Sequence, residues 1–419
     1  MTTRRGRGAL AVRAGGGCTI RNADRILVLR RGPAATVVPA FWAEVGAGAI
    51  HWGRCYEPFA VARDTALKAA LKQSGVAVES HKTSLLYEPW EVKTGSGGPF
   101  KVYSPFWRAC LRTPPDLRLL PAPSRLPPPV QPIASDPLDS WHLLPRQPNW
   151  ARGFTPLWQP GSAGAAAKLA TFLGRAIRSY AEGRNRPDQP LTSSLSPHLH
   201  WGEISPRQLW AAVEDALAQA RAPANDTEKF IAELGWREFA YHLLHHTPTL
   251  AEANFRPEFD QMDWDRDAPG LAGWQAGQTG YPIVDAGMRQ LWTTGWMHNR
   301  VRMITASFLI KHLMVDWRVG QAWFWDTLVD ADLANNAASW QWVAGSGADA
   351  APYFRIFNPV TQGERFDPNG DYVRTFVPEL RRLPASVIHK PWTAPPLVLQ
   401  EAGVRLGTTY PAPVVDHGR

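Results

Sequence analysis

Residues 274–318 read WQAGQTGYPIVDAGMRQLWTTGWMHNRVRMITASFLIKHLMVDWR, and this stretch decides the fold. Apolar residues recur in it every three or four positions, which predicts helices over 283–294 and 298–314. Gly295 lies between the two, where a glycine commonly ends a helix. The stretch therefore predicts a helix pair, and a pair of this kind buries its apolar faces only as part of a larger helical domain.

The same periodicity extends to both sides of this stretch. Ser205 followed by Pro206 is typical of a helix start, and Pro248 of a helix end. Further helices are predicted over 164–182, 206–221, 226–246, 319–329 and 332–343. We therefore expect residues 162–419 to form one all-α domain.

The N-terminal half has a different pattern. Short apolar runs predict strands, and the segments between them have helical spacing. The expected strands are 25–30, 47–52 and 76–80, and the expected helices are 34–45 and 58–74. Alternating strands and helices favour a small parallel α/β sheet within residues 22–111. Residues 112–161 are rich in proline and predict an extended linker, whereas residues 1–21 are expected to be disordered or foreign to the fold.

Composition narrows the function. The chain has 419 residues, and 45 Lys+Arg against 37 Asp+Glu give a net charge of +8, which favours polyanionic partners. No apolar run approaches the roughly 20 residues of a membrane span, and the N-terminus has no secretory core. The three cysteines form neither a disulfide framework nor a metal-ligand cluster, so we expect a cytoplasmic protein. No metal motif, Walker loop or GxGxxG segment is found.

Tryptophan is unusually frequent. The chain has 20 tryptophans, and 12 of them lie between Trp201 and Trp342. Leucine could fill a core equally well, so this density indicates stacking on a planar ligand, electron transfer, or both.

Four polar clusters are candidates for chemistry, and each has a simpler structural explanation. Hydroxyls at Thr192, Ser193, Ser194 and Ser196, around Leu195, would seat a diphosphate before a helix starting at Pro197, or Ser196 would merely cap that helix.

The helix 226–246 places Glu233, Trp236 and Arg237 on one face. They would bind a flat, hydrogen-bonding ligand, or form an exposed ion pair beside a core tryptophan.

Asn299, Arg302 and Met303 repeat this arrangement on the predicted helix 298–314. The alternative makes Arg302 a surface charge and Met303 a core-packing residue.

Asp332, Asn336 and Trp340 share one stripe of a helix, and Asp330 lies just before it. The acids would pair with an arginine near a cofactor, or would only stabilise a helix N-terminus.

Together with DADLANNAASWQW (330–342) and APYFRIFNP (351–359), these motifs closely resemble the DNA photolyase/cryptochrome family, specifically the class I cyclobutane pyrimidine dimer photolyases. The resemblance extends from about residue 22 to the end of the chain and is strongest over 162–382. It implies an α/β N-terminal domain with a Rossmann-like parallel sheet, followed by a linker and a helical domain that binds FAD.

The resemblance also implies roles for single residues. The positions that match the cofactor site are Tyr180, Thr192, Ser193, Ser194, Leu195, Ser196, Phe230, Arg237, Asn299, Arg302, Asp330, Ala331, Asp332 and Asn336. Arg302 and Asp330 match an ion pair beside the flavin, and Asn336 matches the residue that faces flavin N5. Plant cryptochromes tend to have Asp at that position and animal cryptochromes Cys, so Asn336 favours a photolyase.

Substrate and electron-transfer positions are implied in the same way. Glu233, Trp236, Met303 and Trp342 match the pocket for a flipped-out pyrimidine dimer, and Arg184, Arg300 and Arg355 match contacts to the DNA backbone. Trp340, Trp317 and Trp264 match a tryptophan relay from the surface to the flavin. Only the first of the two adjacent histidines of (6-4) photolyases is present, at His298, which favours cyclobutane dimers.

The implied activity is light-driven repair, in which excited reduced FAD gives one electron to the dimer of damaged DNA. We expect a monomer that lies on the nucleoid when bound to DNA. The WFRxDLR segment that opens the family's first strand is absent, so we expect a truncated sheet, with residues 1–21 in place of its first strand–helix unit. Glu57 matches a position linked to the folate antenna, but the sequence leaves a folate or deazaflavin antenna open.

Two other functions stay possible on the sequence. One is a cryptochrome-like blue-light receptor without repair activity. Asn336 and the complete set of dimer-pocket residues argue against it. The other is a truncated remnant that binds flavin and DNA but repairs poorly, and only the shortened N-terminal part supports it.

Overall fold

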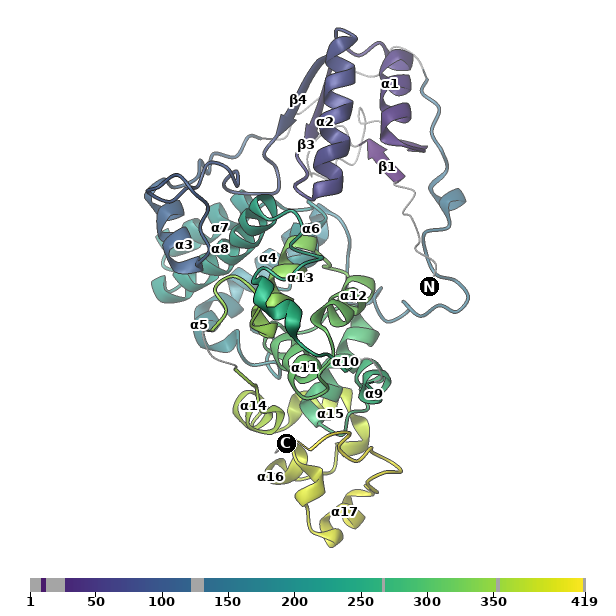
Figure 1. The fold of residues 1–419 in the computed structure, drawn as a ribbon, viewed down its shortest axis with the longest axis vertical. Helices are drawn as coiled ribbons and strands as arrows, with labels where there is room; N and C mark the ends of the chain where they lie inside the picture. The colour runs from purple at the N-terminus through teal and green to yellow at the C-terminus, as the bar shows by residue number, and fades with distance from the viewer. Residues whose placement is uncertain (1–8, 13–26, 122–131, 266–267, 352–354, 417–419) are drawn as a thin grey trace.

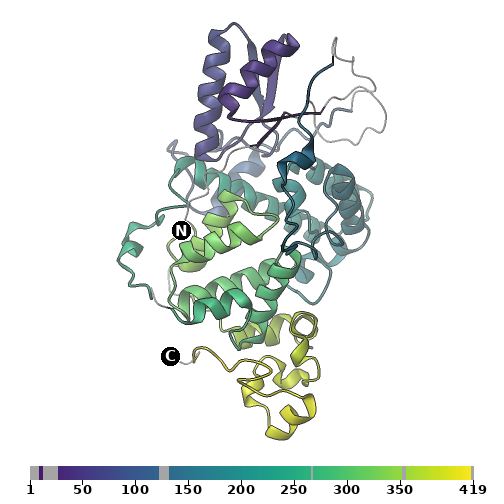
Figure 2. The same ribbon diagram turned by 90° about the vertical axis from the view of Figure 1, so that its right-hand side faces the viewer.

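The computed structural model describes residues 9–12, 27–121, 132–265, 268–351 and 355–416. A small α/β layer lies at one end of the molecule, a body of helices follows, and short C-terminal helices form the other end (Figure 1). A second view, turned by 90°, shows the same order of parts (Figure 2). The expected architecture, an α/β part followed by a larger all-α part, is confirmed.

The α/β layer contains two separate strand pairs. Its elements are β1 (Ala9–Val12), β2 (Val28–Arg31), α1 (Ala34–Val45), β3 (Ala49–Gly53), α2 (Pro58–Gln73) and β4 (Ala77–His81). β3 and β4 are parallel, as expected, with Ala49 opposite Ala77 and Gly53 opposite His81. β2 instead pairs with β1 in the antiparallel direction.

The prediction of one three-stranded parallel sheet is therefore wrong, because the backbone of β2 is bonded elsewhere. β1 pairs with β2, and the linker supplies further partners: Asp136 N donates to Leu29 O (2.8 Å), and Arg31 N donates to the Asp136 carboxylate (3.0 Å). The expected disorder of residues 1–21 does not hold for Ala9–Val12; residues 1–8 and 13–26 lie outside the described residues.

The parallel pair has one covered face and one open face. Side chains alternate between the two faces of a strand. Val78 points toward α2 and joins a core with Leu67, Leu71 and Val76. The residues between, on the opposite face, are exposed along both β3 and β4.

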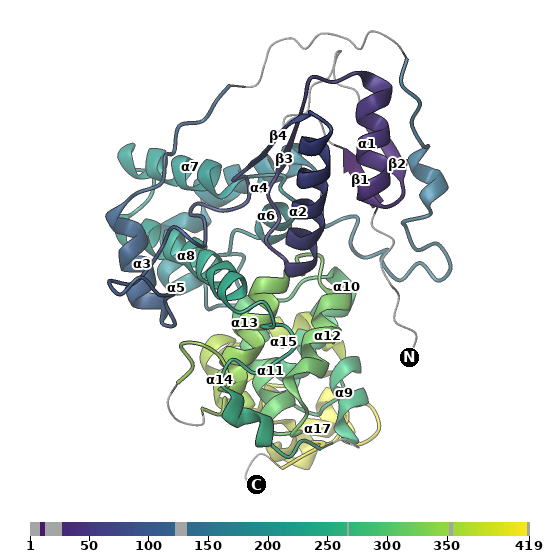
Figure 3. The same ribbon diagram turned by 45° about the horizontal axis from the view of Figure 1, so that its top comes forward.

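The linker follows the surface, as expected. It includes a short 3-10 helix, η1 (Leu138–Trp141), which lies beside β2, where the Arg31 guanidinium is over the Trp141 ring (Figures 1 and 3). Residues 122–131 of the predicted linker lie outside the described residues.

The helical body begins earlier in the chain than expected. Helix α3 (Tyr103–Arg112) falls within the residues assigned to the α/β part but packs on α8 (Ala224–His246). At Gly235 of α8, an added Cβ would lie 2.6 Å from the ring of Trp107 of α3. The first core of the body therefore combines α3 and the segment around Leu85 with α4 (Ser162–Gly174), α7 (Pro206–Ala218) and α8.

The predicted helix 164–182 is wrong in its length. The chain leaves the helical conformation at Arg175, directly after Gly174, and continues as η2 (Ala176–Ser179) and α5 (Tyr180–Gly183). Glycine has a low helix propensity, which explains a break at this point.

A second core lies under the remaining helices. The six predicted helices from 206 to 343 are confirmed with ends shifted by a few residues, and the helix predicted to start at Pro197 is present as α6 (Ser196–His200). The other short elements were not predicted. Beyond α6, the elements are η3 (Pro257–Gln261), α9 (Gly270–Ala276), α10 (Pro282–Thr294), α11 (Asn299–Lys311), α12 (Trp317–Thr327), α13 (Leu333–Ala344), α14 (Pro359–Phe366), α15 (Asp371–Phe376), η4 (Pro378–Leu380), α16 (Ala385–Ile388), η5 (Pro391–Thr393) and α17 (Pro396–Ala402). None of the described helices has the length and apolar character that crossing a bilayer requires.

Candidate functional site

A buried ion pair joins α11 to the segment before α13. Arg302 donates to both oxygens of Asp330 (3.1 and 2.8 Å), and its Nε donates to Met297 O (2.7 Å). Ser196 adds a hydroxyl hydrogen bond to Asp330 (2.6 Å). The predicted pairing of Arg302 with Asp330 is present, and Arg302 is not a free surface charge.

Asp332 is a buried carboxylate with several hydrogen bonds. It caps α13 by accepting from Asn335 N (2.9 Å), and its other oxygen accepts from Tyr241 OH (2.5 Å). Burial alone would raise the pKa of Asp332, but its hydrogen bond to His200, the charge of Arg237 and the Tyr241 hydroxyl together hold that pKa well below its usual range. Asp332 therefore stabilises a helix N-terminus, as the simpler explanation predicted, and also lies in a buried polar network, whereas the arginine pair is made by Asp330.

Asn336 lies one turn after Asp332, so both belong to the same stripe of α13. Its amide donates to Gln321 O of α12 (3.0 Å). Ala331 is half-buried between Asp330 and Asp332. These contacts fix Asn336 in the interior, where only 9 % of its surface is exposed.

An aromatic wall lies on the α8 side of the body. Phe230 packs edge-on against Tyr180 (5.3 Å between centroids) and obliquely against Phe172 (4.7 Å). Thr227, one turn before Phe230, is buried, and its hydroxyl has no hydrogen-bond partner among the described residues.

Two predicted cofactor residues lie differently from the rest. Arg237 donates to Ser84 O (2.5 Å) and lies over the ring of Tyr241, so it ties the N-terminal segment to α8. Asn299 is exposed at the first turn of α11.

The hydroxyl-rich turn before α6 has a constrained backbone. Thr192, Ser193 and Ser194 are half-buried, and Ser194 has a φ of 50°. Leu195 is buried and holds the N-cap position of α6, which begins at Ser196. Ser196 therefore does not cap the helix, and its hydroxyl bonds Asp330 instead.

These residues fit a flavin dinucleotide. Its isoalloxazine ring has two apolar faces and an edge that both donates and accepts hydrogen bonds. The interior offers a forked guanidinium at Arg302, a fixed amide at Asn336 and an unpartnered hydroxyl at Thr227, next to aromatic side chains. Arg302 and Asn336 already have protein partners, whereas the buried Thr227 hydroxyl has none among the described residues, and a bound ligand would supply one.

A second cluster surrounds Glu233 on the outer side of α8. Arg184 forms an ion pair with Glu233, and burial raises the pKa of Glu233 despite that opposing charge. Arg300 donates to Asn185 (2.6 Å) and lies 3.8 Å from the sulfur of Met303. Three of the predicted DNA-facing residues and Met303 are thus brought to one place.

Further cations lie close to this cluster. Burial and the charges of Arg184, Arg365 and Arg355 lower the pKa of Arg300, and burial and Arg355 lower that of Lys311 to about 8. A lowered pKa in a basic side chain means that its charge is unfavourable where it lies. A bound anion would therefore stabilise the positive charges on this surface. Lys311 and Arg365 were not predicted, because no motif marks them.

Trp236 and Trp342 are linked through α3. Trp236, 37 % exposed, stacks on Tyr103 (3.8 Å between centroids, 10° between planes). The backbone of Tyr103 bonds the carboxylate of Asp349, and the carbonyl of Asp349 accepts from Trp342 Nε1 (3.1 Å). Both tryptophans are therefore connected to Tyr103 at the start of α3, Trp236 directly and Trp342 through Asp349. Sequence reasoning missed Tyr103 because it lies 59 residues before the predicted start of the helical domain at residue 162.

The three relay tryptophans share the second core. Trp340 and Trp317 are buried in it, and Trp264 is a partly buried residue packed against it. Trp340 packs edge-on against Phe324 (4.9 Å), and Trp317 donates to Asn254 (2.9 Å). Of the three, Trp264 is the most exposed, and Trp317 and Trp340 are both buried.

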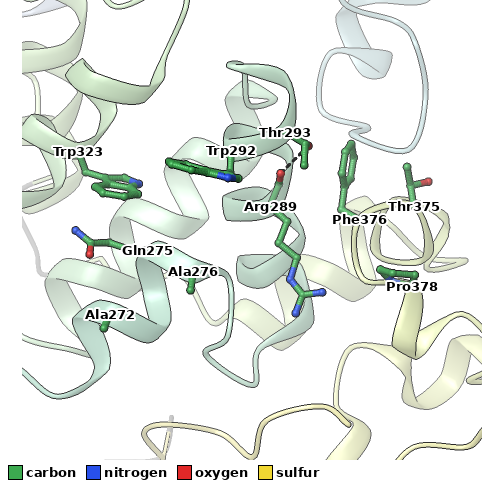
Figure 4. A pocket seen from close by; sticks show the side chains of 10 residues that line it. All are labelled: Ala272, Gln275, Ala276, Arg289, Trp292, Thr293, Trp323, Thr375, Phe376 and Pro378. Atoms are coloured by element: carbon green, nitrogen blue, oxygen red, sulfur yellow. Dashed lines mark hydrogen bonds between the residues drawn. The ribbon is translucent and has the colours of Figure 1, made fainter. Parts of the chain in front are cut away.

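A cavity of about 840 Å³ lies elsewhere, between α9, α10, α12 and the turn after α15. The stacked rings of Trp292 and Trp323 face it on one side, and Arg289 and Phe376 face it on the other (Figure 4). None of the predicted cofactor or DNA residues lines it, so it is distinct from the candidate site.

Comparisons with known proteins agree with this geometry. The model for the FAD binding domain of DNA photolyase matches residues 230–419, and the DNA photolyase model matches residues 19–128. A deoxyribodipyrimidine photo-lyase of Agrobacterium fabrum is 52% identical and aligns with 96% of this chain and 83% of its own. Cryptochrome-1 of Arabidopsis thaliana is 39% identical, over 88% of this chain and 55% of its own.

The similar solved structures change one expectation. A crystal structure described as a bacterial class III photolyase from Agrobacterium tumefaciens superposes with a TM-score of 0.90 at 53% identity, over 94% of this chain and 81% of that chain. The class I assignment is not supported, because this structure, 53% identical to the chain, is described as class III. Matches along nearly the whole sequence, over both the α/β and the helical part, show that this chain belongs to the DNA photolyase/cryptochrome family.

Proposed function

We propose that this protein repairs cyclobutane pyrimidine dimers in DNA in a light-dependent reaction, as a photolyase of the class III type. The observation that carries the proposal is that two groups of residues, one suited to a flavin and one suited to damaged DNA, lie in the same helical part of the protein. A buried polar group suited to a flavin and an outer cluster of aromatic and basic side chains suited to damaged DNA both include side chains of helices α8 and α11.

The buried polar group would hold FAD. Arg302, Asp330, Asp332 and Asn336 would bond its polar edges, Tyr180 and Phe230 would pack against it, and the hydroxyl turn of Thr192, Ser193, Ser194, Leu195 and Ser196 would hold its phosphates. Reduced FAD supplies the chemistry when bound, since on illumination it gives one electron to the dimer and recovers it after the ring opens. The residues' own work is to bind, orient and exclude water.

The outer cluster would take the lesion. A dimer stacks poorly in the duplex, so flipping it out costs less than flipping a normal pair. Trp236, Trp342 and Met303 would pack against the flipped-out dimer. Glu233 would form hydrogen bonds with the edges of its bases. A carboxylate with a raised pKa and an arginine partner is well suited to that task.

The basic residues would hold the DNA backbone. Arg184, Arg300 and Arg355 were predicted for this role, and Lys311 and Arg365 extend the same charge. We propose that the protein acts as a monomer on the nucleoid in the cytoplasm. Trp264, Trp317 and Trp340 would serve a separate purpose, the reduction of oxidised flavin by electrons from the surface.

The test is repair of an oligonucleotide that carries one thymine dimer. Photoreduced protein should restore the thymines under near-UV or blue light and not in the dark. The variant Glu233→Gln should lower the repair yield and bind the damaged strand about tenfold or more weakly, the loss expected for one charged hydrogen bond. Glu228→Gln, exposed on the same helix, is the matched control and should behave as the parent.

The outcomes separate the alternatives. Yellow protein that leaves dimers intact under light would favour a receptor and would refute the proposal. Protein that stays colourless after incubation with FAD would refute the cofactor assignment. Equal repair by the Glu233 and Glu228 variants would refute the placement of the lesion at α8.

A further inference from the structure

The open face of the parallel strand pair carries three metal-binding side chains. Parallel sheets normally have both faces covered, so an exposed polar face on one is unusual. His51 lies directly opposite Glu79 in the β3–β4 register. His81 follows Glu79 by two residues and therefore points to the same face. All three side chains are at least half exposed.

The three ligand atoms converge on one point. His51 Nδ1 lies 3.0 Å from His81 Nε2, and Glu79 Oε2 lies 3.8 Å from each of these nitrogens. The point equidistant from three atoms with these separations lies about 2.1 Å from each, which matches zinc–nitrogen and zinc–oxygen bonds of ~2.0–2.2 Å. The described residues hold no other group of three such side chains at this spacing.

We propose that His51, Glu79 and His81 bind a divalent transition-metal ion, with Zn²⁺ as the first candidate. Two imidazoles and one carboxylate suit zinc, copper and nickel better than magnesium or calcium. Solvent reaches the site, so water would complete the coordination. The ligands come from two strands whose backbones are hydrogen-bonded, so little ordering is needed when the ion binds.

The ion would join the two strands where they need support. The core beneath them contains only four buried residues, Leu67, Leu71, Val76 and Val78. A metal that binds the folded strands and not the unfolded chain raises the unfolding temperature of the part that contains them. The proposed role is therefore a clamp on the α/β layer, independent of flavin and DNA.

The experiment uses the full-length protein without an affinity tag, first treated with a chelator. Isothermal titration with ZnCl₂ should show one ion bound per chain with a micromolar dissociation constant. The double variant His51→Gln/His81→Gln should bind at least ~100-fold more weakly, as two of three ligands are lost. His142→Gln, an exposed histidine of the linker, is the matched control and should bind as the parent.

Two further measurements guard against misfolding of the double variant. Glu79→Gln keeps both imidazoles and should weaken binding by about tenfold with an unchanged circular dichroism spectrum. Co²⁺ bound to the parent should show the visible spectrum of a site with nitrogen ligands, and the double variant should not. No binding by the parent, or equal binding by the double variant, would overturn the proposal. Loss of repair activity plays no part in this test.

Discussion

Replacing Glu238 by Gln should stabilise the protein above neutral pH. Glu238 is buried in α8, and one of its oxygens accepts from Leu86 N (2.9 Å) and Tyr87 N (3.0 Å). Its other oxygen finds no hydrogen-bond partner in the described part of the chain and lies 3.6 Å from Arg237. Burial raises the pKa of Glu238 from 4.5 to about 7, although Arg237, the two backbone amides and Lys82 act in the opposite direction.

The sign follows from proton binding. Between pH 4.5 and about 7 the folded protein keeps the Glu238 proton and the unfolded chain has lost it. The contribution of Glu238 to stability is therefore greatest below pH 4.5, falls as the pH rises to about 7, and stays low above that. At ~1.4 kcal/mol per pH unit, the free energy of unfolding falls by about 3 kcal/mol between pH 4.5 and about 7 through Glu238 alone.

The variant Glu238→Gln keeps a carbonyl for the two backbone amides and has no charge to bury. Against this, it loses the attraction of Arg237. We therefore expect a gain of about 1–3 kcal/mol at pH 8 and little difference near pH 4.5. For a domain of this size the gain corresponds to a melting temperature higher by roughly 2–10 °C.

Thermal melts of both proteins at pH 5, 6, 7 and 8 give the comparison. The melting temperature of the parent should fall more steeply with pH than that of the variant. A variant that melts lower than the parent at pH 8 would refute the reasoning, because it would show that the pair with Arg237 outweighs the burial of charge.

Three further predictions concern the candidate site. Trp340→Phe should slow photoreduction of bound oxidised FAD by tenfold or more and leave repair by chemically reduced protein unchanged. The control Trp325→Phe, at an exposed position, should change neither photoreduction nor repair. Unchanged photoreduction in Trp340→Phe would exclude the relay. In Gly320→Ala the added Cβ would lie 2.2 Å from the ring of Trp340, so the ring must shift. We expect the variant to be less stable by about 1–3 kcal/mol and to photoreduce FAD more slowly. An unchanged rate of photoreduction would mean that the ring does not move. Binding to damaged and undamaged DNA should weaken together as salt rises, and a flat response in filter binding would count against the basic cluster.

The sequence predicted the helical half well because its apolar periodicity is local. The helix over 283–294 and the pairing of Arg302 with Asp330 both follow from short motifs. The α/β half was harder to predict, since β2 is bonded to segments far from it in sequence, Ala9–Val12 and the linker.

Site residues that belong to a local sequence motif were predicted. Those that come together only in the folded structure, from distant segments, were missed. Tyr103 and Asp349 lie 246 residues apart, so no local pattern connects Tyr103 to the tryptophans. The same reason explains the metal ligands. His51 and Glu79 come from different strands, and no spacing rule relates them.

The packing of α3 onto α8 has a consequence for protein engineering. Residues from Leu85 to Cys110 follow the strands along the chain, yet they share a core with the helices. A chimera between two relatives joined at residue 112 would therefore divide that core widely, whereas a junction near residue 82 would exchange the strands and separate only Tyr56 from the rest of the core. Recombination, natural or designed, should tolerate the second crossover and reject the first.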